Sequence, residues 1–253
     1  MKRMHGILSV GMAVLLLVCA LSGCQAKEEG VDVLYRLNKG KESYTLTRVA
    51  SCPDSLIVNR FNGLPVTAIG DKAFYGASCA NLQSLVIGDS VTSIGDYAFW
   101  YSPNLSSLEL GAGLESIGDS AFEDCDSLRQ VKIPDRVYKI GERAFAICNG
   151  SLASVEMGKC VSVIGKEAFT GCLSLKAVTL PMSLTSVGQA AFAECPKLTY
   201  VFYEGTEADW ARVKVGEKNS NLIDHLYFYS AERPTDGGRY WYYGWDGYPT
   251  PWG

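Results

Sequence analysis

Histidine and basic charge are both scarce in this sequence of 253 residues. His5 and His225 are the only histidines, which excludes a histidine-rich metal site. Lys and Arg number 23 against 27 Asp and Glu, a formal net charge of −4. Nucleic-acid-binding proteins need a basic face, so this balance argues against a nucleic-acid partner. Because 47% of the residues are apolar, the chain can nevertheless bury a core.

The motifs of common active sites are also missing. The sequence has no G-x-x-x-x-G-K-[ST], G-x-G-x-x-G, H-E-x-x-H or G-x-S-x-G segment, and no C-x-x-C pair. His225 lies in the apolar stretch 222–227, which we interpret as a terminal strand with a structural histidine. We therefore predict that the protein is not an enzyme, with no catalytic residues, no metal site and no cofactor.

No apolar run reaches the ~20 residues that a membrane-spanning helix needs. The uncharged, mostly apolar stretch 7–21 has 15 residues and follows two basic residues, which is typical of a secretory signal peptide. The L-S-G-C motif that ends at Cys24 resembles the lipobox of bacterial lipoproteins, which implies cleavage before Cys24 and acylation of its thiol. We expect 1–23 to be a lipoprotein signal peptide and 24–30 a lipidated tether, so that the protein is anchored on the cell membrane and faces the extracellular side. The alternative is an ordinary secreted protein cut near Ala26.

Two linked patterns repeat six times in the central part of the chain. The first is I-G-x-x-A-F, with Val in place of Ile in the last copy, and its phenylalanines are 25, 23, 23, 24 and 23 residues apart. These phenylalanines are Phe74, Phe99, Phe122, Phe145, Phe169 and Phe192. The second pattern is L-x-x-[LV]-x-hydrophobic, which follows each copy of the first. Self-similarity at this period is typical of a repeat protein.

A single repeat unit is too small to fold alone. Its large apolar side chains contribute roughly 10 kcal/mol of burial, whereas ordering its backbone costs more, at ~1–2 kcal/mol per residue. Stacked units share their buried faces and become stable together. The L-x-x-V-x-I stretch ends in the period-2 alternation of a short strand, and the A-F segment predicts a turn with a short helical or 3₁₀ segment. We predict a solenoid of leucine-rich-repeat type with a parallel sheet along one face, capped at both ends.

The extended pattern I-G-x-x-A-F-x-x-C-x-x-L-x-x-V-x-I-P resembles the BspA-like leucine-rich repeat family of surface proteins. The resemblance covers the six units in residues 65–203, and we assign 31–64 to an N-terminal cap and 204–230 to a C-terminal cap. In the family a short helix follows the last strand, and Thr206 with Asp209 has the spacing of a capping box for such a helix. The family implies adhesion to host proteins, to the extracellular matrix or to other cells.

The cysteines outside the signal peptide and the lipobox number seven. A column in the repeats comprises Cys79, Cys125, Cys148, Cys172 and Cys195. We favour a ladder of free, buried thiols for this column. Cross-coil disulfides are the alternative, because an exported location permits them and a coil spacing of ~4.8 Å does not exclude them. The pattern does not place Cys52 and Cys160.

The final segment, 231–253, is unusually aromatic. Seven Tyr and Trp residues lie between positions 240 and 252, and Asp246-Gly247 among them is a signal for a hairpin with a two-residue loop. We favour an aromatic hairpin tail that packs on the C-terminal coil. The alternative is an aromatic platform for sugars or peptidoglycan, in which Trp241 and Trp245 bind the ligand.

The outer side of the predicted sheet is the first place to look for a binding surface. Its central column reads Val86, Glu109, Lys132, Glu156, Thr179 and Phe202, and Tyr200 ends the column beside it. We select Glu109, Lys132, Glu156, Tyr200 and Phe202 as candidate ligand-binding residues.

The leading hypothesis is a lipid-anchored bacterial surface protein whose solenoid mediates protein binding or adhesion, with a protein or glycan partner at the cell exterior. The alternative is a cell-wall carbohydrate-binding module that uses the aromatic tail. An enzyme with carboxylates in a cleft is a third hypothesis.

Overall fold

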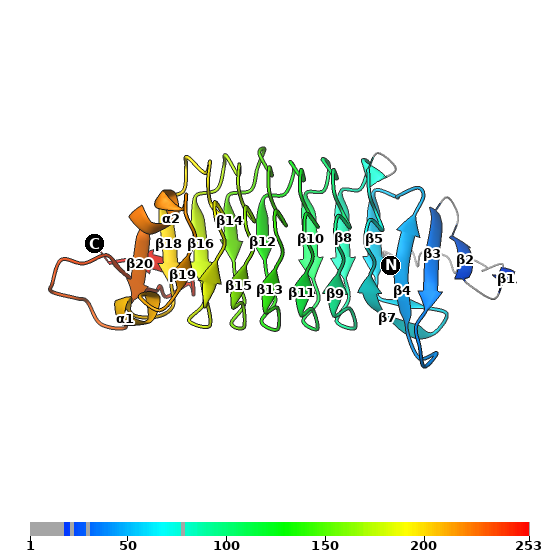
Figure 1. Cartoon of the computed structure of the whole chain (residues 1–253), viewed down its shortest axis with the longest axis horizontal. Helices are drawn as coiled ribbons and strands as arrows, with labels where there is room; N and C mark the ends of the chain where they lie inside the picture. Colours follow the sequence, from blue (N-terminus) through cyan, green and yellow to red (C-terminus); the bar gives the residue numbers. More distant parts are fainter. Residues whose placement is uncertain (1–17, 21–22, 29–30, 77–78, 253) are drawn as a thin grey trace, which may run out of the picture.

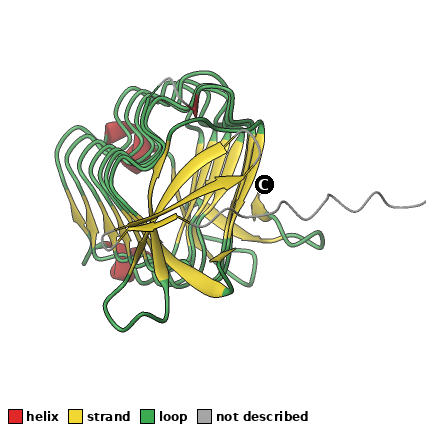
Figure 2. Cartoon of the chain, turned by 90° about the vertical axis from the view of Figure 1, so that its right-hand side faces the viewer, coloured by secondary structure: helices red, strands yellow, loops and turns green. Residues whose placement is uncertain are grey.

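The computed structural model of the chain describes residues 18–20, 23–28, 31–76 and 79–252. Its repeats wind into an elongated solenoid whose coils stack along the long axis (Figure 1). Viewed end-on, the coils superpose one behind another (Figure 2). The predicted leucine-rich-repeat solenoid is confirmed. Most of the predicted signal peptide, residues 1–17 and 21–22, lies outside the described residues.

The L-x-x-V-x-I stretches form a first row of parallel strands, which we call the long-strand face. Its strands are β5 (Ser55–Val58), β8 (Ser84–Ile87), β10 (Ser107–Leu110), β12 (Gln130–Lys132), β14 (Ser154–Glu156), β16 (Ala177–Leu180), β18 (Tyr200–Tyr203) and β20 (Leu226–Tyr229). The ladder is interrupted once, because β5, β8 and β10 form one sheet and the strands from β12 onward form another. The alternation within each strand points one set of side chains inward, as the sequence predicts.

A second row of parallel strands, the short-strand face, was not expected from the sequence. It comprises β7 (Leu64–Ile69), β9 (Ser93–Ile94), β11 (Ser116–Ile117), β13 (Lys139–Ile140), β15 (Val163–Ile164), β17 (Ser186–Val187) and β19 (Lys214–Val215). All but β7 are two residues long, too short to show an alternating pattern in the sequence. The predicted sheet along one face is therefore corrected to parallel ladders along two faces.

The phenylalanines of the repeat form a continuous stack inside the solenoid. Successive rings lie 4.5 to 5.4 Å apart between centroids and are close to parallel. All six are fully buried. In the first five turns the phenylalanine N–H donates to the alanine carbonyl of the next coil, for example from Phe145 to Ala168 at 2.8 Å. Side-chain stacking and backbone bonding therefore join each coil to its neighbour.

The glycine of each I-G pair allows the coils to approach closely. A Cβ atom on Gly141 would lie 2.5 Å from the carbonyl carbon of Gly118 in the preceding coil, and one on Gly165 would meet Gly141 at the same distance. Such contacts are closer than any side chain tolerates. The residue before each repeat alanine adopts a left-handed conformation, with φ between +51° and +56° from Lys72 to Ala190. These two features together keep the I-G-x-x-A-F turns of successive coils in close contact. We call the side of the solenoid that these turns form the turn edge.

The N-terminal cap extends the short-strand face beyond the first coil. Its strands β3 (Val31–Leu37) and β4 (Tyr44–Val49) pair antiparallel, and β4 then pairs parallel with β7. Ahead of the cap, β1 (Val18–Ala20) of the predicted signal peptide pairs antiparallel with β2 (Gly23–Glu28), which lies mostly in the predicted tether and pairs antiparallel with β3. β6 (Arg60–Phe61) pairs with the start of β7. Tyr35 and Phe61 stack at 4.1 Å and Tyr44 meets Phe61 edge-on, so aromatic rings close this end of the core. The backbone of Cys24 lies in β2, within the segment that the sequence assigns to a tether.

The C-terminal cap replaces the missing seventh coil. β19 repeats the Val-Gly step but no Ala-Phe turn follows it, and α2 (Ser220–Asp224) begins instead. Asn219 is 2% exposed; its Oδ1 accepts from the Phe192 N–H, and its Nδ2 donates to the carbonyls of Gly188 and Gly216. The Asn219 side chain thus accepts from the last phenylalanine N–H, which in the earlier turns donates to a backbone carbonyl of the next coil. The predicted capping box of Thr206 and Asp209 is present at α1 (Glu207–Trp210).

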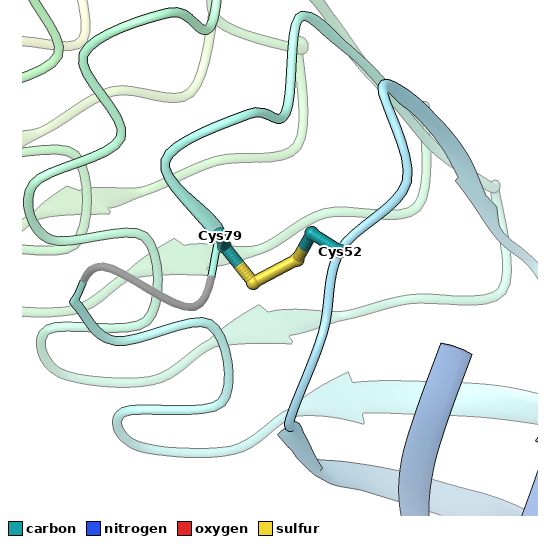
Figure 3. Close-up of a disulfide and its surroundings, with 2 residues drawn as sticks. All are labelled: Cys52 and Cys79. Carbon is teal, nitrogen blue, oxygen red and sulfur yellow. A yellow bond between two sulfur atoms is a disulfide. The ribbon is translucent and has the colours of Figure 1, made fainter. Parts of the chain in front are cut away.

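The cysteines of the cap and the repeats divide into a disulfide, a row of buried thiols and the exposed, free Cys160. Cys52 pairs with Cys79 across 27 residues and joins the N-terminal cap to the first coil (Figure 3). Free, buried thiols are found at Cys125, Cys148, Cys172 and Cys195. Each of these four sulfurs contacts the carbonyl oxygen of the phenylalanine in the preceding coil, at 3.2 to 3.5 Å. The favoured thiol ladder is therefore correct for these four and wrong for Cys79.

The aromatic tail forms the predicted hairpin, from β21 (Tyr240–Tyr243) to β22 (Pro249–Pro251). The Gly244 N–H donates to the Tyr248 carbonyl, so Trp245, Asp246 and Gly247 form the loop. Gly247 has a φ of +78°. The loop thus has three residues where the sequence predicted two, a common hairpin type that ends in a left-handed glycine. The stretch 222–227, expected to be one strand, is divided between α2 and β20 with His225 between them.

Candidate functional site

The exposed part of the long-strand face lies in its N-terminal and central coils. Register pairing places Glu109 of β10 beside Val86, and Lys132 of β12 beside Glu156 of β14. Glu109, Lys132 and Glu156 are all exposed. Because equivalent residues of stacked coils fall in straight columns, these charges form one row along the solenoid.

Lys132 and Glu156 form an ion pair within this row. The Lys132 Nζ lies 2.7 Å from Glu156 Oε1, and the two side chains are 75% and 57% exposed. The hydrogen bond to Glu156 raises the pKa of Lys132. At such exposure the pair adds little to stability, so its charges remain available to a partner. Glu109 lies across the interruption between β10 and β12 and carries a separate negative charge.

The C-terminal part of the same face is covered by aromatic rings. Phe202 of β18 is buried, with Trp241 5.4 Å and Tyr227 5.9 Å from its ring. Tyr200 stacks on Phe202 at 5.7 Å and is still partly exposed. Phe202, selected from the sequence as an outward ligand-binding residue, therefore has no free ring face. A side chain that points outward from its strand is not exposed when a later segment of the chain packs over that strand, as the segment with Tyr227 and Trp241 does here.

Trp241 and Trp245, the two candidates in the tail, have opposite environments. Trp241 is fully buried, and its Nε1 donates to the Tyr203 carbonyl at 2.8 Å. Its ring cannot stack on a ligand in this structure, which corrects its selection as a platform residue. Trp245 at the hairpin loop is 100% exposed, and Tyr248 beside it is 70% exposed.

An exposed aromatic cluster on the turn edge was missed by the sequence reasoning. Tyr75 and Trp100 follow the repeat phenylalanines of the first two coils and stack at 4.8 Å, and Tyr101 lies next to Trp100. The Lys72 Nζ lies 5.8 Å from the ring centre of Tyr75. The sequence does contain a signal for this cluster, because aromatic residues follow only the first two repeat phenylalanines. The residues that follow the other four are Glu123, Ala146, Thr170 and Ala193.

Farther along the turn edge, Arg143 bridges three coils. Its Nη2 lies 2.6 Å from Glu123 Oε1 and its Nη1 lies 2.6 Å from Glu167 Oε2. The hydrogen bond from Arg143 lowers the pKa of Glu167, and the bond to Glu123 raises the pKa of Arg143. Each charge has its partner within the protein, so this cluster is a structural clamp.

No arrangement typical of catalysis emerges in the described part of the chain. No group of three or more His, Cys, Asp and Glu side chains there could hold a metal ion. The Nδ1 of His225 lies 2.9 Å from the Asn221 carbonyl and belongs to the C-terminal cap. Nothing is described of the Cys24 side chain, so its lipidation stays a prediction. Among the described helices, none has the length and apolar character to cross a membrane.

Comparison with known proteins relates the whole repeat region to one family. The model of the BspA type leucine rich repeat region matches residues 67–199 in six copies. No curated protein matches the chain.

Two solved structures illustrate the likeness in fold. The leucine rich repeat protein of T. pallidum is 29% identical with a TM-score of 0.63, over 72% of this chain and 82% of that chain. A leucine rich cell surface protein from Faecalibacterium prausnitzii is 22% identical with a TM-score of 0.51, over 89% of this chain and 60% of that chain. The second likeness shows the fold alone.

Proposed function

We propose that this chain, which belongs to the BspA type leucine-rich repeat family, is a bacterial surface protein that is anchored by a lipid on Cys24 and binds proteins through its solenoid. Leucine-rich repeat proteins are binding scaffolds, and stacked repeats create extended surfaces that suit a large partner. The related protein of F. prausnitzii is described as a cell surface protein. Adhesion is the form of binding that the family resemblance supports.

The observation that carries this proposal is the row of exposed charges on the long-strand face. Glu109, Lys132 and Glu156 lie on regular strands, so the backbone holds their positions without a ligand. A row of mixed charge at fixed backbone positions favours electrostatic complementarity with a protein surface.

Site-directed photo-crosslinking on intact cells tests where a partner binds. Lys132 and Lys139 are a matched pair, since both are exposed lysines of one coil on opposite faces. A photoreactive residue at position 132 should give high-mass adducts, and the same residue at position 139 should not. Equal adducts at both positions, or none at either, would contradict binding by the long-strand face.

Carbohydrate binding by the aromatic tail is a second candidate function. The full exposure of Trp245 beside Tyr248 favours it, because a large apolar ring in water gains free energy from any partner that covers it. A glycan array with Trp245→Ala tests this role. Trp241→Ala is unsuitable here, because Trp241 is buried and its loss would disturb the hairpin itself.

A further inference from the structure

A cavity opens at the C-terminal end of the solenoid, apart from both surfaces discussed above. It has a volume of about 660 Å³ and lies between α1, β20 and the start of β21. The long-strand face continues through β20 to β21, whereas the short-strand face ends at β19. The inner side of the last strands therefore has no further coil beneath it. The volume falls within the range of small-ligand sites, ~300–1,000 Å³.

One wall of the cavity is aromatic and held in place. Phe228 and Tyr240 are register partners in β20 and β21, so their side chains share one face of the sheet. The Tyr240 hydroxyl donates to Asp236 Oδ2 at 2.8 Å. A Cβ atom on Gly238 would meet the Tyr240 ring, so the ring lies directly against that glycine. The wall is thus ordered before any ligand arrives.

The side formed by α1 carries a carboxylate. Glu207 is the first residue of α1, it is exposed, and its carboxylate has no partner among the described residues. The capping box of Thr206 and Asp209 fixes the backbone that positions it. Among the described residues, those that line the cavity include no Lys, Arg or His.

From this arrangement we propose that the cavity binds a neutral sugar ring of a glycan. The C–H face of a pyranose would stack on Phe228 and Tyr240, and its hydroxyls would donate to the Glu207 carboxylate. An anionic ligand is disfavoured by Glu207 and Asp236. A cationic ligand prefers a cage of several rings, whereas Tyr229, the third aromatic residue of the lining, packs its ring edge-on to Trp241 at 5.2 Å. The proposal goes beyond the candidate function of the tail, because it places the sugar site in the cavity, apart from the tail loop.

Titration of the purified full chain with maltotriose, cellotriose, xylotriose and tri-N-acetylchitotriose tests the proposal by calorimetry. We expect at least one trisaccharide to bind with a Kd on the order of 1 mM. Glu207→Gln and Tyr240→Ala should each weaken it by about tenfold, a loss of ~1.4 kcal/mol. Trp245→Ala and Glu217→Gln, which change exposed residues outside the cavity, should leave it unchanged. Glu207→Gln keeps the proposal testable if Tyr240→Ala does not fold, because Glu207 is exposed and its substitution preserves the size of the side chain.

The possible outcomes separate the cavity from the broader proposals. Sugar binding that persists in Glu207→Gln and Tyr240→Ala but is lost in Trp245→Ala would overturn the cavity and support the tail. Absence of binding by all four trisaccharides would overturn the cavity as a sugar site, and the glycan array would then decide the tail independently. Binding of tetramethylammonium that is weakened in Glu207→Gln, with no binding of any trisaccharide, would assign the wall to cations and also overturn the proposal. None of these outcomes affects the crosslinking test of the long-strand face.

Discussion

Ser102 occupies, in the second coil, the place that cysteine has in the four coils that follow. It is fully buried, and its hydroxyl has no hydrogen-bond partner in the part of the chain that the structure describes. The thiols at the equivalent positions each contact a phenylalanine carbonyl, as Cys125 does with Phe99. A buried hydroxyl that is unpaired loses its hydration without compensation, whereas a thiol loses little.

Ser102→Ala is therefore expected to stabilise the protein by about 1 kcal/mol, because it removes an unpaired buried oxygen with little change in volume. Urea unfolding measures the change. Ser107→Ala, at an exposed position on the long-strand face, is the control and should have almost no effect. A loss of stability in Ser102→Ala would show that the hydroxyl has a partner, such as a bound water.

Asn219→Ala should destabilise the C-terminal end by about 2 kcal/mol, because it leaves the Phe192 N–H and the Gly216 carbonyl without this partner and removes one of the two bonds to the Gly188 carbonyl. Hydrogen exchange at the Phe192 amide should accelerate, which locates the effect at the last turn. The neighbouring Asn221→Ala, which loses a single contact of 3.4 Å, serves as the control. Equal effects of the two substitutions would contradict the capping role of Asn219.

The environment of residues with a place in the repeat could be predicted from the sequence, whereas outside the repeat only local signals could be used, such as the capping box of Thr206 and Asp209. The column position of Cys125, Cys148, Cys172 and Cys195 follows from the repeat spacing alone. The partner of Cys52 depends on how the N-terminal cap folds against the first coil, which no periodicity encodes. Asn219 was missed for the same reason, since its role exists only where the repeat stops.

At the scale of the element, the glycine column and the phenylalanine stack set the spacing of the coils. Gly141→Ala is expected to destabilise the protein by about 3 kcal/mol, because the new Cβ would lie 2.5 Å from the backbone of Gly118 and the coils would have to separate. Thermal unfolding measures the effect. At Gly70 the nearest atom to an added Cβ is 3.1 Å away, so Gly70→Ala should cost clearly less. A reversed order would mean that the glycines serve backbone conformation rather than close approach.

Phe145→Ala should destabilise the protein by ~3–5 kcal/mol, because the ring is fully buried and stacks on Phe122 at 5.1 Å and on Phe169 at 5.4 Å. Chemical denaturation measures the loss. Tyr138→Ala, an exposed aromatic in the same coil, is the matched control and should stay within ~0.5 kcal/mol of wild type. An effect below about 1 kcal/mol for Phe145→Ala would contradict the assigned inward face.

The two rows of strands differ in how far the sequence predicts them. The long strands show two inward apolar residues and one outward residue, which is enough to indicate a strand. The short strands have a single inward residue, such as Ile140 of β13, and their pairing comes from neighbouring coils. Local pattern therefore predicts the first ladder, and only stacking creates the second.

At the scale of the whole molecule, the two ends differ more than the repeats between them. The N-terminal end is closed by the cap and the disulfide, and the C-terminal end by Asn219 and the aromatic hairpin. The burial of Trp241 depends on a bond to Tyr203, 38 residues earlier in the chain, so the sequence alone could not distinguish it from the exposed Trp245. The solenoid itself was predictable because its contacts repeat with the sequence period.

A lipid on Cys24 would hold the solenoid by its N-terminal end and leave the long-strand face open to partners. Two or three acyl chains, at roughly 0.8 kcal/mol per buried CH₂, are enough for stable attachment to a membrane surface. Surface display is therefore the central claim on which the proposed binding function depends.

The intact mass of the protein purified from its native membrane fraction tests this claim most directly, beside a Cys24→Ala variant. We predict a chain that begins at Cys24 and carries the mass of its acyl chains, and a variant that lacks this added mass and leaves the membrane fraction. A wild-type protein with an unmodified Cys24, recovered outside the membrane fraction, would contradict the account and make the chain a secreted solenoid.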